Sequence, residues 1–243
     1  MPEENKSSPV SAPKTSLSTT ASADITRKHS VSIPGLHARL RNPVQQAVSD
    51  PNTKPNRIAL LLDVSGSMQG SKITSLRDAC ASFVQACNFA DTALAIEPFG
   101  EGNPPPNRLS LTVFQPLALT TVQMLQSCGS TPMAQAMDFV LNSYSLTRCV
   151  LVSDGEPDSV TAAYDIAAQY REAGLPCDCV HIGHSTSGEE CLRRIAEMTG
   201  GQYIKFTDIN SFAKSFKFLT PAYYAMLCDG RVSALDIGAK EIK

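Results

Sequence analysis

The stretch Ile58–Met68 reads IALLLDVSGSM, an apolar run that ends in a carboxylate followed by two hydroxyls. The run Ile58–Asp63 predicts a β-strand, and further short apolar runs alternate with amphipathic stretches along the chain. That alternation is typical of βαβ units around a mostly parallel sheet. Ligands bind such sheets at the carboxyl ends of the strands, which is where Asp63, Ser65 and Ser67 stand. The stretch therefore predicts both a fold class and the place of a site.

The residues after Gly70 carry one apolar stripe at helical spacing, which predicts a helix over about residues 72–90. Its members are Leu76, Ala79, Cys80, Phe83, Val84 and Cys87. By the same reasoning we expect further helices at Thr121–Ser127, Pro132–Ser143, Ser159–Ala173, Glu189–Met198 and Ile209–Leu227. We expect further strands at Cys149–Ser153, Cys177–Ile182 and Gln202–Phe206.

Two more strand-like runs, Thr92–Pro98 and Arg108–Phe114, follow the first helix without room for another helix between them. The turn-rich Gly100–Asn107 connects them, so they should pair as an antiparallel hairpin at one edge of the sheet. The sequence thus predicts an α/β domain with a mostly parallel six-stranded sheet and one antiparallel edge strand.

The composition excludes several classes of protein. The chain has 243 residues, of which 42% are hydrophobic, and a formal net charge of -2, so a fibrous or wholly disordered chain is not indicated. It has no Trp and no basic cluster, which disfavours a nucleic-acid surface. The run Ile58–Leu62 is far shorter than the roughly 20 residues that a membrane span needs. Met1–Thr20 is polar and lacks the apolar core of a signal peptide, so we expect a cytoplasmic protein.

The ends of the chain differ from its middle. Residues 1–55 are rich in Ser, Thr and Pro, which predicts a disordered or docking N-terminal tail. We expect the folded domain to occupy residues 56–228 and a short C-terminal tail to occupy residues 229–243.

The eight cysteines are scattered rather than paired, which indicates buried reduced thiols instead of a disulfide framework. Cys177-x-Cys179-x-His181-x-x-His184 contains the ligand types that zinc prefers. On an extended strand, however, alternate residues stand almost 7 Å apart, which is too far for one tetrahedral site. Packed side chains beneath a helix are the favoured interpretation.

Oxygen-bearing side chains close several segments at the predicted carboxyl edge of the sheet. Besides Asp63, Ser65 and Ser67, they are Thr131 at a helix start and Asp154 at the end of a strand. Taken singly, each has a structural explanation as a turn or a helix cap. Together they offer hydroxyl and carboxylate oxygens only, which suit a hard cation such as Mg²⁺ rather than zinc or copper.

This combination resembles the von Willebrand factor type A family over about residues 57–227. Asp63, Ser65 and Ser67 match its D-x-S-x-S signature, and Thr131 and Asp154 match the rest of its metal-ion-dependent adhesion site. The resemblance implies a Rossmann-like, doubly wound sheet with helices on both faces. It also implies that the three hydroxyls bind Mg²⁺, with Mn²⁺ or Ca²⁺ as alternatives, while the two aspartates hold the metal's water ligands.

The phrases Gly129–Pro132 and Ser153–Pro157 look most like bacterial intracellular members of that family. The resemblance therefore implies an adaptor or complex subunit, with AAA+ ATPases as one partner class. With neutral hydroxyls as inner ligands the ion keeps much of its charge. We expect a partner protein's Asp or Glu to complete its shell.

Other functions fit the sequence less well. Gly66–Lys72 departs from a phosphate-binding loop at two positions, and no nucleophile elbow surrounds Ser65 or Ser67. We therefore expect no enzyme activity. Two alternatives stay open: an extracellular adhesion protein, which disulfides would favour, and a metal-assisted phosphoester hydrolase.

Overall fold

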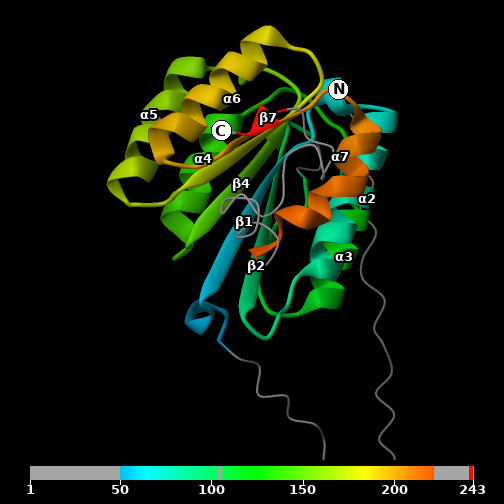
Figure 1. Ribbon diagram of the computed structural model, residues 1–243, viewed down its shortest axis with the longest axis vertical. Helices are drawn as coiled ribbons and strands as arrows, with labels where there is room; N and C mark the ends of the chain where they lie inside the picture. The colour runs from blue at the N-terminus through cyan, green and yellow to red at the C-terminus, as the bar shows by residue number, and fades with distance from the viewer. Residues whose placement is uncertain (1–49, 103–105, 222–240, 243) are drawn as a thin grey trace, which may run out of the picture. The chain divides into compact units, whose positions relative to one another are not determined.

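The computed structural model describes residues 50–102, 106–221 and 241–242 (Figure 1). Within them, one sheet has the strand order β3-β2-β1-β4-β5-β6-β7. The strands are β1 (Asn56–Asp63), β2 (Thr92–Phe99), β3 (Leu109–Thr112), β4 (Arg148–Ser153), β5 (Cys177–Ile182), β6 (Tyr203–Phe206) and β7 (Glu241–Ile242). The helices are α2 (Ser71–Ala86), α3 (Gln115–Gln123), α4 (Met133–Ser143), α5 (Val160–Glu172), α6 (Thr186–Thr199) and α7 (Ile209–Ser215). Short 3₁₀ helices are η1 (Pro51–Thr53), η2 (Gly66–Met68) and η3 (Phe216–Leu219).

The pairing of the strands confirms the predicted α/β architecture. β2, β1, β4, β5 and β6 run parallel, and β3 pairs antiparallel with β2 as the expected hairpin partner. β7 adds a seventh strand, antiparallel to β6 at the other edge. It lies in the segment predicted to be a C-terminal tail, and its two residues are too few to show a strand period.

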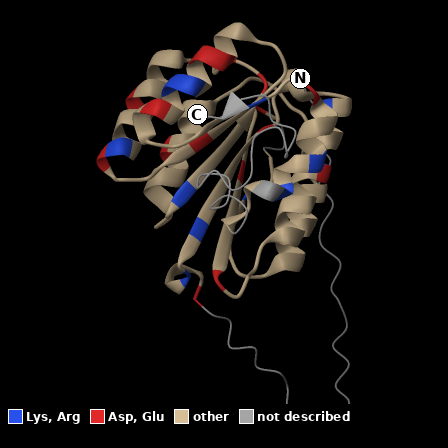
Figure 2. Ribbon diagram, viewed as in Figure 1, with Lys and Arg blue, Asp and Glu red and all other residues tan. Residues whose placement is uncertain are grey.

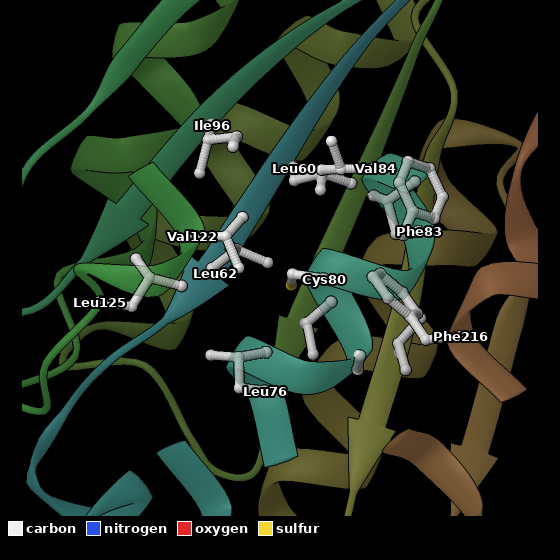
Figure 3. Close-up of a cluster of buried hydrophobic side chains, with 14 of the residues drawn as sticks. Leu60, Leu62, Leu76, Cys80, Phe83, Val84, Ile96, Val122, Leu125 and Phe216 are labelled. Carbon is white, nitrogen blue, oxygen red and sulfur yellow. The ribbon is translucent and has the colours of Figure 1, made fainter. Parts of the chain in front are cut away.

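Alternate residues of each central strand pack into two different cores. Leu60 and Leu62 of β1 face a layer formed by α2, α3, α7 and η3, whereas Ala59 and Leu61 face α4, α5 and α6. Figure 3 shows the first core, where Phe83 of α2 and Phe216 of η3 meet with ring centroids 5.2 Å apart. Helices therefore cover both faces of the sheet (Figure 1), as the period-2 alternation of strands requires.

The helix predicted at Thr121–Ser127 was misplaced, since α3 starts at Gln115 and ends at Gln123. Pro116 stands in its first turn, where proline is favoured because the missing N–H has no partner there anyway. The Thr120 and Thr121 hydroxyls donate to the carbonyls four residues earlier. Pro116 thus indicates where the helix starts, which the spacing of apolar residues did not.

The final helix is also shorter than predicted over the described residues. α7 begins at Ile209, capped by the Asp208 carboxylate, but ends at Ser215 and continues as the tighter turn η3. A 3₁₀ turn at the end of an α-helix is common. The remainder of the predicted Ile209–Leu227 helix, from residue 222 on, lies outside the described residues.

β1 begins at Asn56, and η1 at Pro51–Thr53 precedes it within the last residues of the predicted tail. Residues 1–49 of the predicted tail lie outside the described part of the chain. Within the described ranges, the helices are all too short or too polar to cross a lipid bilayer. Most charged side chains lie on helices and loops rather than on strands, and α5 and α6 carry both signs (Figure 2).

Candidate metal centre

The predicted site lies where the winding of the sheet reverses. β1 is flanked by β2 on one side and by β4 on the other, and their connections run through helices on opposite faces. The loops after β1 and β4 therefore diverge at the carboxyl ends of these strands, which is the usual place for a ligand in doubly wound sheets. Asp63 is the last residue of β1, and Asp154 directly follows β4.

Asp63 is fully buried at the carboxyl end of β1. Its Oδ1 accepts a hydrogen bond from the Ser65 main-chain N–H at 2.8 Å, and its Oδ2 accepts one from the Ser153 hydroxyl at 2.5 Å. Burial raises the pKa of Asp63 above its ordinary value, the two serines oppose this shift, and the charge of Asp154 adds to it. A cation above Asp63 would stabilise the ionised carboxylate.

Three side-chain oxygens form a row beside Asp63, which we call the oxygen row: Ser65 Oγ, Ser67 Oγ and Asp154 Oδ1. Ser65 Oγ and Ser67 Oγ lie 3.0 Å apart, and the Ser67 hydroxyl donates to Asp154 Oδ1 at 2.7 Å. Neighbouring ligands of an octahedral Mg²⁺ with bonds of about 2.1 Å lie about 2.9 Å apart. The donors and their spacing thus fit a hard divalent cation.

Lys72 also belongs to this cluster, although the sequence did not indicate it as a site residue. It is the second residue of α2, and its ammonium forms an ion pair with Asp154 Oδ2. Asp154 is thereby bonded on both oxygens, by the Ser67 hydroxyl and by a cation of the chain itself. Lys72 lies in the stretch Gly66–Lys72 that was compared with a phosphate loop, and this was the only signal for it.

Thr131 lies on the neighbouring loop, which main-chain contacts hold against the D-x-S-x-S segment. The Gly66 N–H donates to the Gly129 carbonyl at 2.9 Å. Gly129 has φ +61°, and a Cβ there would lie 1.8 Å from the Glu101 carbonyl oxygen, so the close approach requires glycine. The Thr131 N–H donates to Asp158 Oδ1 at 2.9 Å.

The structure thus joins Asp63, Ser65, Ser67 and Asp154 by short polar contacts and places Thr131 on the adjoining loop. Asp158 fixes the Thr131 main chain from both sides, because its Oδ1 accepts from the Thr131 N–H and its own N–H donates to the Thr131 carbonyl at 3.0 Å.

The segment once considered for zinc is part of the interior. Cys177, Cys179 and His181 are completely buried on β5, and the part of the chain that the structure describes contains no group of three or more His, Cys, Asp and Glu residues placed to hold a metal ion. Seven cysteines in that part are free thiols. The interpretation as packed, reduced side chains is therefore supported.

Comparison with known proteins agrees with this architecture. The model of the von Willebrand factor type A domain matches residues 56–204, more than half of the chain. No curated protein sequence matches closely enough to count as a relative.

Solved structures resemble the fold at low sequence identity. BatB from Bacteroides thetaiotaomicron superposes with a TM-score of 0.54 at 16% identity, over 67% of this chain and 95% of BatB. The vWF domain of the pili tip protein Mfa5 from Porphyromonas gingivalis gives 0.58 at 10% identity, over 71% and 96%. The manganese-loaded TRAP protein from Plasmodium vivax gives 0.54 at 18% identity, over 79% and 76%. By its matching family model and its fold, this chain belongs to the von Willebrand factor type A domain family.

Proposed function

We propose that the chain is a Mg²⁺-dependent protein-interaction module whose metal binds at Asp63, Ser65, Ser67, Thr131 and Asp154. A partner protein supplies an Asp or Glu carboxylate to the metal's open position, and the module itself catalyses no reaction. Because neutral hydroxyls are the inner ligands, the ion keeps enough positive charge to attract that carboxylate.

The oxygen row carries this proposal. The 3.0 Å spacing of Ser65 Oγ and Ser67 Oγ suits neighbouring ligands of one small cation, and the Ser67 hydroxyl also donates at 2.7 Å to Asp154 Oδ1, which follows another strand. The family assignment adds to it, because von Willebrand A domains are generally interaction modules and the similar TRAP structure is manganese-loaded. Mn²⁺ and Ca²⁺ are the alternatives to Mg²⁺.

A cytoplasmic location is favoured over an extracellular adhesion role by the free thiols. Seven described cysteines form no disulfide although Cys149 and Cys177 are paired neighbours on β4 and β5. Free buried thiols are typical of reducing compartments. A complex that contains an AAA+ ATPase remains our prediction for the partner, and it rests on the resemblance to bacterial intracellular members.

Metal binding is the first part to test, by calorimetric titration of Mg²⁺ and Mn²⁺ into the full chain. We expect one site in the wild type and at least about tenfold weaker binding in Ser65→Ala, because a ligand oxygen is lost. Ser211→Ala, a half-buried serine on α7 that bonds Asp208, is the matched control. Equal metal affinity in Ser65→Ala and Ser211→Ala would contradict the assignment.

Partner binding is the second part, tested by pull-down from lysate with wild type in Mg²⁺, wild type in EDTA and Ser65→Ala. A partner lost in both perturbed samples supports a metal-bridged carboxylate. A partner retained in all three contradicts it and moves the interaction to another surface.

A further inference from the structure

A second hollow lies beside the metal centre, between the carboxyl end of β2, the start of β3 and the start of α4. It has a cavity volume of about 190 Å³ and lies one residue from Thr131 along the chain, since Pro132 is in its wall. Its apolar lining comes mainly from three prolines and a phenylalanine: Pro98, Pro106, Pro132 and Phe99.

Glu97 is the acidic residue of this hollow, and it stands where an apolar residue is expected. β2 alternates so that Ala95 and Phe99 enter the core beneath α4, and Glu97 shares their face. Its side chain is 3% exposed. Burial raises the pKa of Glu97 from 4.5 to about 7, although the positive charge of Arg108 opposes this shift. A carboxylate in such a place destabilises the fold unless it is fully paired.

Only half of the Glu97 carboxylate is paired. Oε1 lies 3.0 Å from Arg108 Nη2, and the guanidinium stands 4.0 Å above the centre of the Phe139 ring of α4. Oε2 is buried and has no hydrogen-bond partner among the residues that the structure describes. Buried polar atoms are almost always bonded, so this oxygen indicates a missing donor.

The same protein shows what the complete arrangement looks like. On α6, Glu189 Oε1 lies 2.9 Å from Arg193 Nη2, and this guanidinium stands 4.2 Å above the Tyr203 ring. The second oxygen, Glu189 Oε2, is bonded by the ammonium of Lys205. Glutamate, arginine and aromatic ring are therefore arranged alike at both places. Only the lysine is lacking at Glu97.

We propose that the hollow at Glu97 is a subsite for a lysine side chain of the partner protein. The proline and phenylalanine walls take the methylene stem, and the ammonium bonds Glu97 Oε2 as Lys205 bonds Glu189. A long basic side chain is suited to this because its stem is apolar and only its tip is charged. Arg108 stays in place, since it uses the other oxygen.

The subsite rests on the proposed function for the source of the lysine, which is the protein that gives its carboxylate to the metal. Thr131 and Pro132 are consecutive, so the hollow adjoins the loop that carries Thr131, and one short stretch of the partner is proposed to reach both. The subsite selects partners in which a lysine lies near the metal-binding Asp or Glu. Its chemistry needs no metal, which allows it to be tested separately.

The probe is N-acetyl-lysine-N-methylamide, titrated into the ¹⁵N-labelled full chain in EDTA at pH 8 and followed by NMR. Its uncharged analogue, N-acetyl-norleucine-N-methylamide, is the matched ligand. We expect saturable shifts at the amides of Gly100, Arg108 and Gln135, with binding of the norleucine probe at least tenfold weaker. Equal shifts with both probes, or no saturable shift, would overturn the proposal.

Variants assign the contact to the carboxylate. Glu97→Gln should weaken the lysine probe at least tenfold, whereas Glu189→Gln, the same change in the complete arrangement, should leave it unaltered. Arg108→Gln should strengthen binding of the lysine probe, because a positive charge that repels the ammonium is removed, and this variant decides the matter if Glu97→Gln fails to fold. Unchanged affinity in Glu97→Gln contradicts the subsite. Because metal is absent throughout, failure of the metal proposal appears only in the calorimetry.

Discussion

Glu97 and Glu189 have similar neighbouring side chains, but their pKa values are shifted in opposite directions. Each has an arginine on Oε1, and in each case that arginine lies over an aromatic ring. Glu189 also has Lys205, and its pKa is lowered, first by the hydrogen bond from Lys205 and then by that from Arg193. Among the described residues no lysine bonds Glu97, which is more deeply buried, and its pKa is raised to about 7. The comparison teaches that an arginine alone does not compensate for burial.

The largest effect on the hollow at Glu97 is expected from the substitution Gly129→Ala. Its Cβ would collide with the Glu101 carbonyl, displacing the segment next to Gly100, which lines the Glu97 hollow. We expect a loss of about 3–5 kcal/mol in the free energy of unfolding, measured by urea denaturation. The control is Gly174→Ala, which has a similar φ of +66° but open space around it and should lose only about 1 kcal/mol. Equal losses would show that the contact is unimportant.

Neutralising Glu97 and neutralising Glu189 should change the free energy of unfolding in opposite directions at pH 8. Because the folded chain binds the Glu97 proton more tightly than the unfolded chain, stability falls as the pH rises from 4.5 to about 7. Glu97→Gln should therefore be more stable than wild type at pH 8, by about 1–3 kcal/mol, and near equal at pH 4.

Glu189 should behave in the opposite way. Its lowered pKa means that ionisation stabilises the fold above its ordinary value of 4.5, and that this contribution is lost as the pH falls below it. Glu189→Gln should thus destabilise the protein slightly at pH 8. Thermal melts of both variants from pH 4 to 8 check the pair, and parallel pH profiles would refute the contrast.

Removing Arg108 and removing Arg193 should destabilise the protein to different extents. Arg108→Met leaves a buried carboxylate without its ion pair and should cost about 1–2 kcal/mol at pH 8, less than for a fully buried pair because Arg108 is half exposed. Arg193→Met should cost less than about 1 kcal/mol, because Glu189 keeps Lys205. The double variant Glu97→Gln/Arg108→Met should recover most of the loss in denaturant melts. An additive double variant would count against this account.

The smallest effect concerns a third carboxylate, Asp154, which is paired with a lysine as Glu189 is. Lys72→Met removes a positive charge beside the metal centre, so Mg²⁺ should bind roughly three- to tenfold more tightly in calorimetric titrations. Lys54→Met is the control, because Lys54 precedes β1 at the far end of that strand and donates to the Ala90 carbonyl. Weaker Mg²⁺ binding in Lys72→Met would mean that the lysine positions Asp154 rather than competing with the metal.

The sequence predicted six of the seven described strands and the D-x-S-x-S cluster of oxygen side chains for one physical reason. Apolar runs and the D-x-S-x-S spacing are local, so Asp63, Ser65 and Ser67 are visible without knowledge of tertiary contacts. The subsite at Glu97 could not be predicted in this way. Its parts come from separate elements, and a glutamate within the run TALAIEPF was the single sign of it.

Strand β7 has a consequence for the solubility of the folded chain. A parallel sheet ends in strands with unpaired main-chain groups, which can recruit another molecule and start aggregation. Here β2 is covered by four residues of β3, and β6 by the two residues Glu241 and Ile242. Such short antiparallel strands leave few main-chain hydrogen-bonding groups with which a strand of another molecule could pair. Glu241 and Ile242 thus reduce the length of β6 that is open to pairing with a strand of another molecule.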